Sequence, residues 1–162
     1  KSISKYFSKN YVNKKFVIYS SPLERALLTA EIIAQGINYP KQKIIIEERL
    51  NDFNLGEIAG TTWKKVSETL PDLARIRLED PMNFHPRGGE SGIEFESRLR
   101  SFLNELVDKD IPKILVSHGI VNKFILGILK NLTGKEMIAL DEAQDIIYFM
   151  DNGSEKKINI TQ

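Results

Sequence analysis

The sequence predicts an α/β protein with a mostly parallel sheet. Short apolar runs at residues 16–20 (FVIYS) and 113–117 (KILVS) each pass directly into a helical pattern. The second run is hydrophobic almost throughout, as expected for a parallel strand that is covered on both faces. Strands that alternate with helices are typical of such sheets.

Composition sets limits on the class of protein. A chain of 162 residues with 41% hydrophobic and 28% charged residues can bury the core of one domain, which we expect to span residues 1–162. No apolar run is long enough to cross a bilayer and the N-terminal residues contain no signal-peptide core, so we expect a cytoplasmic protein that binds no membrane. A formal charge of +1 indicates no general attraction for nucleic acid.

Cysteine and histidine are scarce. The chain has no cysteine, which excludes disulfides and thiolate catalysis, and its two histidines leave little for a zinc site. We therefore expect neither a metal nor another cofactor. The sequence contains no signal for the oligomeric state.

The first third of the chain reads as helix, strand, helix, strand. Residues 1–8 have the apolar spacing of the end of a helix, and residues 16–20 form a strand. A helix then begins at Pro22 and runs to residue 35, with Ser21 as its cap and Glu24 completing a Ser-x-x-Glu capping box. Residues 43–50 (KIIIEERL) form the second strand.

Turn-rich and helical segments alternate in the middle of the chain. Residues 51–62 are connecting structure, and short helices follow at residues 63–70 and 72–80. Residues 81–89 hold two prolines and two glycines in nine positions, so they form a loop that is long enough to be a lid. A capping box of Ser91 and Glu94 opens a longer helix that ends near residue 108. The expected inner face of that helix is Ile93, Leu99, Phe102, Leu103 and Leu106.

The last third returns to strands. After the strand at residues 113–117, residues 120–132 form an amphipathic helix, and Thr133 with Glu136 makes a third capping box before a short helix. Residues 145–150 and 156–160 form a hairpin at the end of the chain.

Candidate functional residues follow the ends of two predicted strands. Parallel pairing would bring Ser21 and Arg25 to the same sheet edge as His118 and Gly119, where open α/β sheets bind ligands. Arg25 lies near the start of a helix, which suits an anion, and a glycine amide beside His118 suits a phosphoryl oxygen. The alternatives are a solvated arginine paired with Glu24 and a buried histidine bonded to the backbone.

Other polar residues carry weaker signals. Asp52 follows the second strand and could donate a proton if burial raised its pKa, although from spacing alone a turn aspartate is the better explanation. His85 is expected at the surface of the loop. The Gly88-Gly89-Glu90-Ser91 run lacks the pattern of a nucleotide-binding loop and indicates only a turn before a capped helix.

Four segments, taken in order, resemble a known family. SSPLERALLTAEII, LNDFNLGEIAG, PRGGES and VSHG are similar to motifs of the histidine phosphatase superfamily, also called phosphoglycerate mutase-like. The resemblance implies an αβα sandwich in which a histidine attacks a phosphate and becomes phosphohistidine. That intermediate is then hydrolysed or passes its phosphoryl group to an acceptor.

The resemblance also implies roles for individual residues. Arg25 would bind the transferred phosphoryl group, and His118 with the Gly119 amide would stabilise it. Asp52 matches the general acid, where the family usually has glutamate, and its shorter side chain changes its reach. Glu57 is a nearby substitute but not the family's counterpart, because the usual Trp-Glu-Gly is Ile-Ala-Gly at residues 58–60.

The family's nucleophile has no match in these residues. It lies in an Arg-His-Gly motif at the end of the first strand, and this motif does not occur in the sequence. Residues 1–8 resemble the end of the family's first helix, so we expect a segment with this motif upstream of Lys1. Losing an inner strand would remove hydrogen bonds and apolar cover worth as much as the ~5–15 kcal/mol stability of a domain.

The favoured function is a metal-independent phosphatase that acts on a small phosphorylated metabolite through phosphohistidine. A phosphoglycerate mutase is the alternative, although residues 51–89 are short for the inserts that such mutases carry there. A phosphate-binding module without turnover is a third possibility if the nucleophile is truly absent. The natural substrate stays open, with His85 and Arg87 as possible contacts only.

Overall fold

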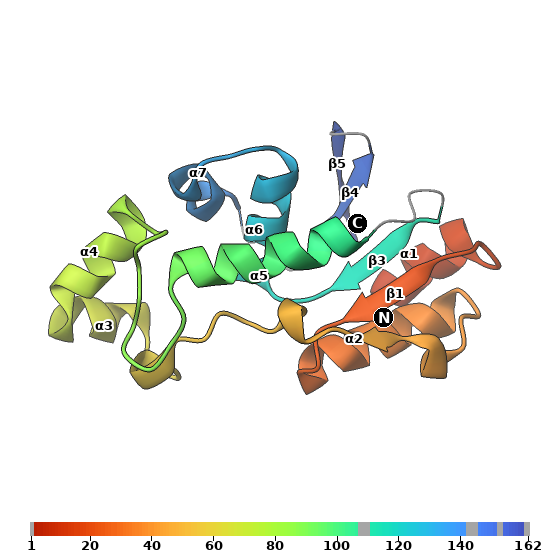
Figure 1. The fold of residues 1–162 in the computed structure, drawn as a ribbon. Helices are drawn as coiled ribbons and strands as arrows, with labels where there is room; N and C mark the ends of the chain where they lie inside the picture. Colours follow the sequence, from red (N-terminus) through yellow and green to blue (C-terminus); the bar gives the residue numbers. More distant parts are fainter. Residues whose placement is uncertain (1, 107–110, 142–145, 152–153, 161–162) are drawn as a thin grey trace. The chain divides into compact units, whose positions relative to one another are not determined.

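A computed structural model describes residues 2–106, 111–141, 146–151 and 154–160 (Figure 1). These residues form seven α-helices and five strands, which confirms the predicted mixed α/β class. They divide into two compact units, and each is described by itself. Unit 1 comprises residues 1–51, 106–119 and 143–162, and unit 2 comprises residues 52–105 and 120–142. The prediction of one domain over residues 1–162 stays a prediction.

Unit 1 contains a parallel sheet of three strands in the order β2-β1-β3. These are β1 (Val17–Ser20), β2 (Ile45–Ile46) and β3 (Lys113–Val116). Ser20 at the end of β1 pairs in register with Ile46 on one side and with Val116 on the other. The carboxyl ends of all three strands therefore lie at one edge.

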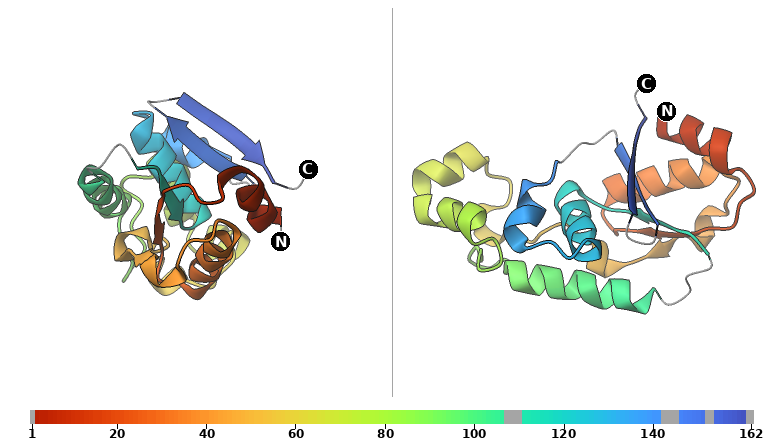
Figure 2. Two further views of the ribbon diagram at one scale, coloured as in Figure 1. Left: turned by 90° about the vertical axis from the view of Figure 1, so that its right-hand side faces the viewer. Right: turned by 90° about the horizontal axis from the view of Figure 1, so that it is seen from above.

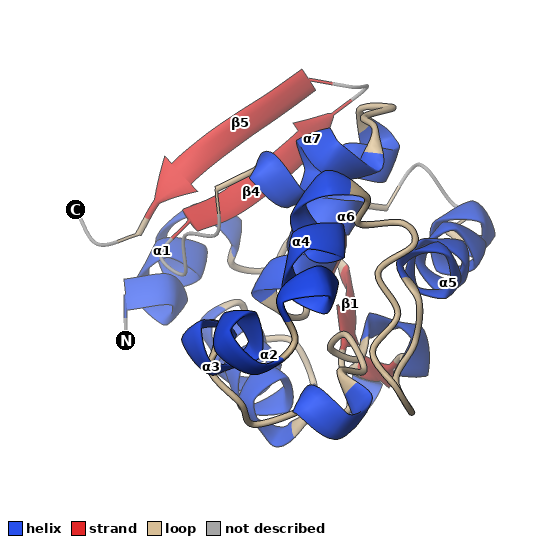
Figure 3. Ribbon diagram, turned by 90° about the vertical axis from the view of Figure 1, so that its left-hand side faces the viewer, coloured by secondary structure: helices blue, strands red, loops and turns tan. Residues whose placement is uncertain are grey.

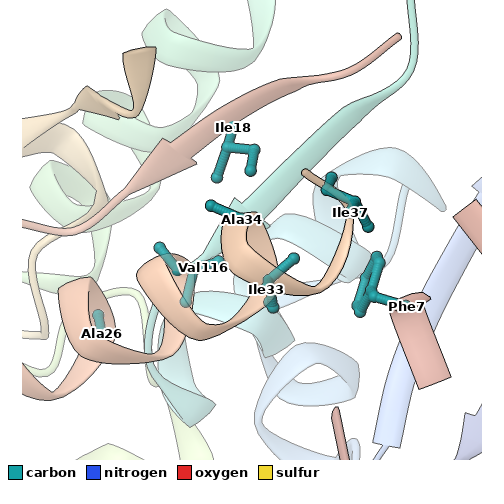
Figure 4. Packing of buried hydrophobic residues seen from close by; sticks show 8 residues of the cluster. Phe7, Ile18, Ala26, Ile33, Ala34, Ile37 and Val116 are labelled. Carbon is teal, nitrogen blue, oxygen red and sulfur yellow. The ribbon is translucent and has the colours of Figure 1, made fainter. Parts of the chain in front are cut away.

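Helices α1 (Ser2–Tyr11) and α2 (Glu24–Gly36) supply most of the core of unit 1. Small and branched side chains of α2 pack on the strands, and aromatic residues of α1 extend the cluster, as Figure 4 shows. The buried members are Phe7, Ile18, Ala26, Ala30, Ile33, Ala34, Ile37 and Val116. Close packing of alanines lets α2 approach the sheet, which fixes where its first turn lies relative to the strand ends.

The hairpin at the end of the chain is also confirmed. Strands β4 (Ile146–Asp151) and β5 (Ser154–Asn159) pair antiparallel, with Ile147 opposite Ile158, and are drawn as two adjacent arrows in Figure 2. Position 145 of the predicted strand and the turn at residues 152–153 lie outside the described residues.

Unit 2 is helical, as Figure 3 shows by its blue ribbons. Two of the predicted capping boxes are present: Ser91 with Glu94 ahead of α5, and Thr133 with Glu136 ahead of α7. Phe95 and Phe124 pack edge to face inside the unit, with ring centroids 4.7 Å apart. The helices are α3 (Trp63–Thr69), α4 (Pro71–Glu79), α5 (Gly92–Glu105), α6 (Gly119–Leu129, whose first residue belongs to unit 1) and α7 (Gly134–Ala139).

Two turns of unit 2 are held together by their backbones. The Glu57 N–H donates to the Arg87 carbonyl at 3.0 Å, and the Glu90 N–H donates to the Asn54 carbonyl at 3.0 Å. Gly56 lies between these contacts with φ of +50°, and a Cβ there would lie 2.2 Å from the Arg87 oxygen. Only glycine fits this approach. The predicted loop at residues 81–89 is thus fastened at its C-terminal end.

Three expectations about elements need correction. The second strand is two residues long and lies between short 3-10 turns at Lys41–Lys43 and Glu48–Leu50. Glu47 accounts for the early end, because its carboxylate accepts a hydrogen bond from the Arg49 N–H and pulls the chain into a turn. On α5, Ile93 is 56% exposed and Phe95 is buried in its place. The third correction concerns Ser21, which lies in the candidate site and is described there.

Candidate active site

The ends of β1 and β3 bring together two polar residues from distant parts of the sequence. The Ser21 N–H donates to the Val116 carbonyl at 2.9 Å, which continues the ladder by one step beyond β1. Ser21 and His118 are both buried, and the Ser21 hydroxyl lies 2.8 Å from Nε2 of His118. The predicted juxtaposition at one sheet edge is therefore present in unit 1.

Hydrogen bonding fixes the tautomer of His118. The Nε–H of Arg25 donates to Nδ1 of His118 at 3.2 Å. Because a guanidinium can only donate, Nδ1 accepts and carries no proton. In the neutral imidazole the proton is then on Nε2, which donates to the Ser21 hydroxyl. Both ring nitrogens are thus held by named partners.

Arg25 lies in the first turn of α2, as predicted. Its side chain remains exposed to solvent, although its Nε–H contacts the buried imidazole. Gly119 directly follows His118 and is the first residue of α6. A guanidinium and the start of α2 give this edge positive potential, which suits an anion.

Ser21 does not cap α2. The helix begins at Glu24, its N-cap is Leu23, and no side chain caps it. The Ser21 hydroxyl instead accepts from the Leu23 N–H at 3.3 Å and from His118. The expected capping box is therefore wrong, because a long-range bond to the histidine engages the hydroxyl that the local pattern assigned to the helix. The adjacency of Ser21 and His118 at one predicted edge was the signal for this pairing.

Asp52 belongs to unit 2. Its carboxylate accepts from the Phe53 N–H at 3.0 Å, and its carbonyl accepts from Arg98 at 3.1 Å. Arg98 in turn makes a bidentate ion pair with Glu90, with both N···O distances at 2.9 Å, and its guanidinium stacks on a phenylalanine ring. The backbone at Asp52 is therefore anchored by a charge-assisted pair. Its partnership with His118 in one site stays a prediction.

The weaker candidates lie in exposed positions. Glu57 is exposed and is part of a short 3-10 turn, Gly56–Ile58. His85 is exposed, in agreement with its prediction as a surface residue. Arg87 is also exposed, and only its carbonyl takes part in the turn contact.

The described residues contain neither a cluster of metal ligands nor a membrane-spanning helix. Among residues 2–106, 111–141, 146–151 and 154–160, no three histidine, aspartate or glutamate side chains group as metal ligands would. In the same ranges, no helix has the length and apolar character of a membrane span.

Comparison with known proteins agrees with this fold. The family model of the histidine phosphatase superfamily (branch 1) matches residues 5–155, so the chain belongs to this superfamily. The family resemblance predicted from the four motifs is thereby confirmed.

Relatives and solved structures carry phosphatase names. Phosphoserine phosphatase 1 of Hydrogenobacter thermophilus is 34% identical over 106 residues, covering 64% of this chain and 49% of the relative. Putative phosphoserine phosphatase 2 of the same organism is 30% identical over 118 residues, which are 72% of this chain and 57% of the relative. This chain thus spans about half the length of these curated relatives.

Among solved structures, mycobacterial glucosyl-3-phosphoglycerate phosphatase is similar with a TM-score of 0.69 and 25% identity, over 86% of this chain and 68% of that one. YhfR of Bacillus stearothermophilus has a TM-score of 0.74 at 24% identity, over 98% of this chain and 80% of that one. The second likeness concerns the fold alone.

Proposed function

We propose that the protein is a phosphatase that hydrolyses a small phosphomonoester through a phosphohistidine intermediate. The observation that carries this proposal is the Arg25–His118 contact at the carboxyl edge of a parallel sheet, in a chain of the histidine phosphatase superfamily. The names of the two phosphoserine phosphatases support a small phosphorylated substrate.

Arg25 and His118 bind the phosphoryl group in this proposal. An arriving phosphate draws the Arg25 donor away from Nδ1, and its negative charge favours the imidazolium form of His118. The new Nδ1–H then donates to a phosphoryl oxygen, while the Nε2–H keeps its bond to Ser21. Arg25 then contributes guanidinium N–H groups, and the Gly119 amide a further donor, to the phosphoryl oxygens. Donors aimed at charge that develops in the transition state lower its energy.

The nucleophile and the acid complete the reaction. We propose that a histidine of the Arg-His-Gly motif that the family resemblance implies attacks phosphorus, while Asp52 gives its proton to the leaving alcohol oxygen. Water then attacks the phosphohistidine, and Asp52 accepts a proton from that water. Inorganic phosphate leaves, and both groups return to their starting states. No metal takes part in these steps.

The test measures hydrolysis of 4-nitrophenyl phosphate by the natural full-length protein. We expect kcat/KM to fall about 10²–10³-fold in Arg25→Ala and in His118→Ala, because each removes a donor to the transferring group. Arg100→Ala is the control, since Arg100 is half exposed on α5 and pairs with Glu96.

Two outcomes would contradict the proposal. Wild-type rates in both variants would show that the edge is not the active site. Full-length protein that binds phosphate without hydrolysing any ester, and never gains the mass of a phosphoryl group, would favour the binding module instead.

Location and further partners are proposed on the sequence alone. We propose a cytoplasmic protein with no nucleic-acid or membrane partner. The net charge of +1 and the lack of an apolar run of membrane-spanning length in the printed sequence support this proposal.

A further inference from the structure

Unit 2 contains a cavity of about 260 Å³ beside Asp52. This volume is just below the roughly 300–1,000 Å³ of ordinary small-molecule sites. Eight of its ten lining residues are apolar, and the other two are Asp52 and Arg77. Besides the Trp63 indole N–H, hydrogen-bonding side chains in the lining are therefore confined to Asp52 and Arg77.

The walls of the cavity are aromatic and held in place. Phe84 is buried, and its ring lies 5.7 Å from Phe53 and 6.1 Å from Trp63. The Arg77 guanidinium stacks over the Trp63 ring at 3.9 Å and fixes its orientation. Packing of this kind forms a flat, preorganised surface for another ring.

The position of Asp52 connects this cavity to the reaction. In the proposed function Asp52 protonates the leaving oxygen, which must therefore come within hydrogen-bond reach of its carboxyl group. The part of the substrate that leaves with that oxygen then occupies the space that Asp52 lines. This step rests on the proposed function.

The chemistry of the walls selects the leaving group. A sugar or glycerol moiety would place several hydroxyls against apolar side chains, where each unpaired group weakens binding several-fold. An aromatic or compact apolar group would bury its surface there without that loss. We propose that the cavity is a leaving-group subsite, and that the substrate is the phosphomonoester of a flat, predominantly apolar alcohol.

Two esters of primary alcohols test the proposal without a difference in leaving-group type. With the natural full-length protein, we expect kcat/KM for benzyl phosphate to exceed that for glycerol 1-phosphate at least 30-fold. Trp63→Ala should raise KM for benzyl phosphate about 10-fold and change the value for glycerol 1-phosphate less than 2-fold. Leu78→Ala is the control, because Leu78 is exposed on α4 and does not line the cavity.

A binding measurement separates this inference from the catalytic one. Trp63 is the single tryptophan of the printed sequence. The tryptophan emission of the full-length protein, after subtraction of the emission of a Trp63→Phe variant, therefore reports on ligand binding in the cavity. Benzylphosphonate, which cannot be hydrolysed, should change that emission at concentrations at least 10-fold lower than 2,3-dihydroxypropylphosphonate.

The outcomes are distinct. Equal binding of the two phosphonates, or equal effects of Trp63→Ala on both esters, would overturn the subsite while leaving the phosphatase intact. Selective binding of benzylphosphonate without hydrolysis of any ester would support the subsite and overturn the proposed function. Circular dichroism and thermal unfolding of Trp63→Ala, compared with the wild type, guard against a folding defect.

Discussion

The hydroxyl of Ser21 lies at the centre of the sheet edge and accepts two hydrogen bonds. It accepts from the Leu23 N–H at the start of α2 and from Nε2 of His118 after β3. Arg25 and Ser21 together determine where the imidazole proton lies when the site holds no phosphate, because Arg25 donates to Nδ1 and Ser21 accepts the proton on Nε2. We therefore regard Ser21 as a positioning residue rather than a helix cap.

Replacing Ser21 with alanine should disturb His118 without touching the phosphate. The Nε2–H would lose its acceptor in a buried place, and we expect about 1–2 kcal/mol lower stability and roughly 10-fold lower kcat/KM. Imidazole ¹⁵N chemical shifts of full-length protein should report loss of the single tautomer, and Ser21→Thr should restore it.

The control for this change is Ser67→Ala, because the Ser67 hydroxyl is exposed and bonds only within its own helix in the structure described. An unchanged tautomer in Ser21→Ala would contradict the positioning role, even if the protein were less stable.

The residue scale also shows where sequence reasoning works. Arg25 and His118 could be placed together because strand ends in a parallel sheet share an edge. Ser21 was assigned to a cap because Ser-x-x-Glu is a local pattern, whereas its real partner is 97 residues away. Local patterns do not register such long-range bonds.

At the scale of elements, the two turns that meet at Gly56 and Gly89 fasten the loop ahead of α5. A Cβ on Gly89 would lie 2.3 Å from the Asn54 carbonyl, which mirrors the crowding at Gly56. The backbone bonds between these turns also hold Glu90, whose carboxylate binds the Asn54 N–H and Arg98. These contacts extend to Asp52, because Arg98 also donates to the Asp52 carbonyl.

Gly56→Ala should disrupt the contact between these two turns. The new methyl group meets a carbonyl oxygen and the φ of +50° adds strain, so we expect the free energy of unfolding to fall by about 2–4 kcal/mol. Urea unfolding measures the change. Gly60→Ala is the matched control, because Gly60 has φ of +76° with no atom within 4 Å, and strain alone costs about 1 kcal/mol. Equal losses in the two variants would show that the turns do not press on each other.

Elements were predicted well where their signals are local. The capping boxes at Ser91 and Thr133 set the start of α5 and α7 correctly, since the partner residues are three positions apart. The second strand was predicted too long because its apolar run continues past the point where Glu47 turns the chain. How far a strand extends depends on the strands that pair with it, and its own apolar run does not specify them.

For the whole molecule, the order of motifs predicted the fold class and the family, since both follow from alternating strands and helices with a strong match over residues 5–155. The arrangement of the site across the chain was less accessible. His118 and Asp52 lie in different units, and no local pattern specifies how separate units meet.

Acid sensitivity is a property that both units share. In unit 1, the side-chain hydrogen bond from Arg49 lowers the pKa of Glu47. In unit 2, backbone and side-chain hydrogen bonds from Ser91 and Thr133 lower the pKa values of Glu94 and Glu136 below their ordinary 4.5. The folded state therefore binds these protons more weakly than the unfolded chain does. This stabilisation is fully present above pH 4.5 and is lost as pH falls through the lowered values.

We expect the Tm of the full-length protein to fall as pH is lowered from 6 to 3, through carboxylates of both units. In the triple variant Glu47→Gln, Glu94→Gln, Glu136→Gln, the Tm at pH 6 should be lower and its decline toward pH 3 shallower, because those three groups no longer titrate. Glu68→Gln, which changes an exposed carboxylate on α3, should follow the wild-type curve. A triple variant with the wild-type slope would mean that other carboxylates control acid unfolding. The capping glutamates would then act on the helix starts without governing the pH range in which the molecule stays folded.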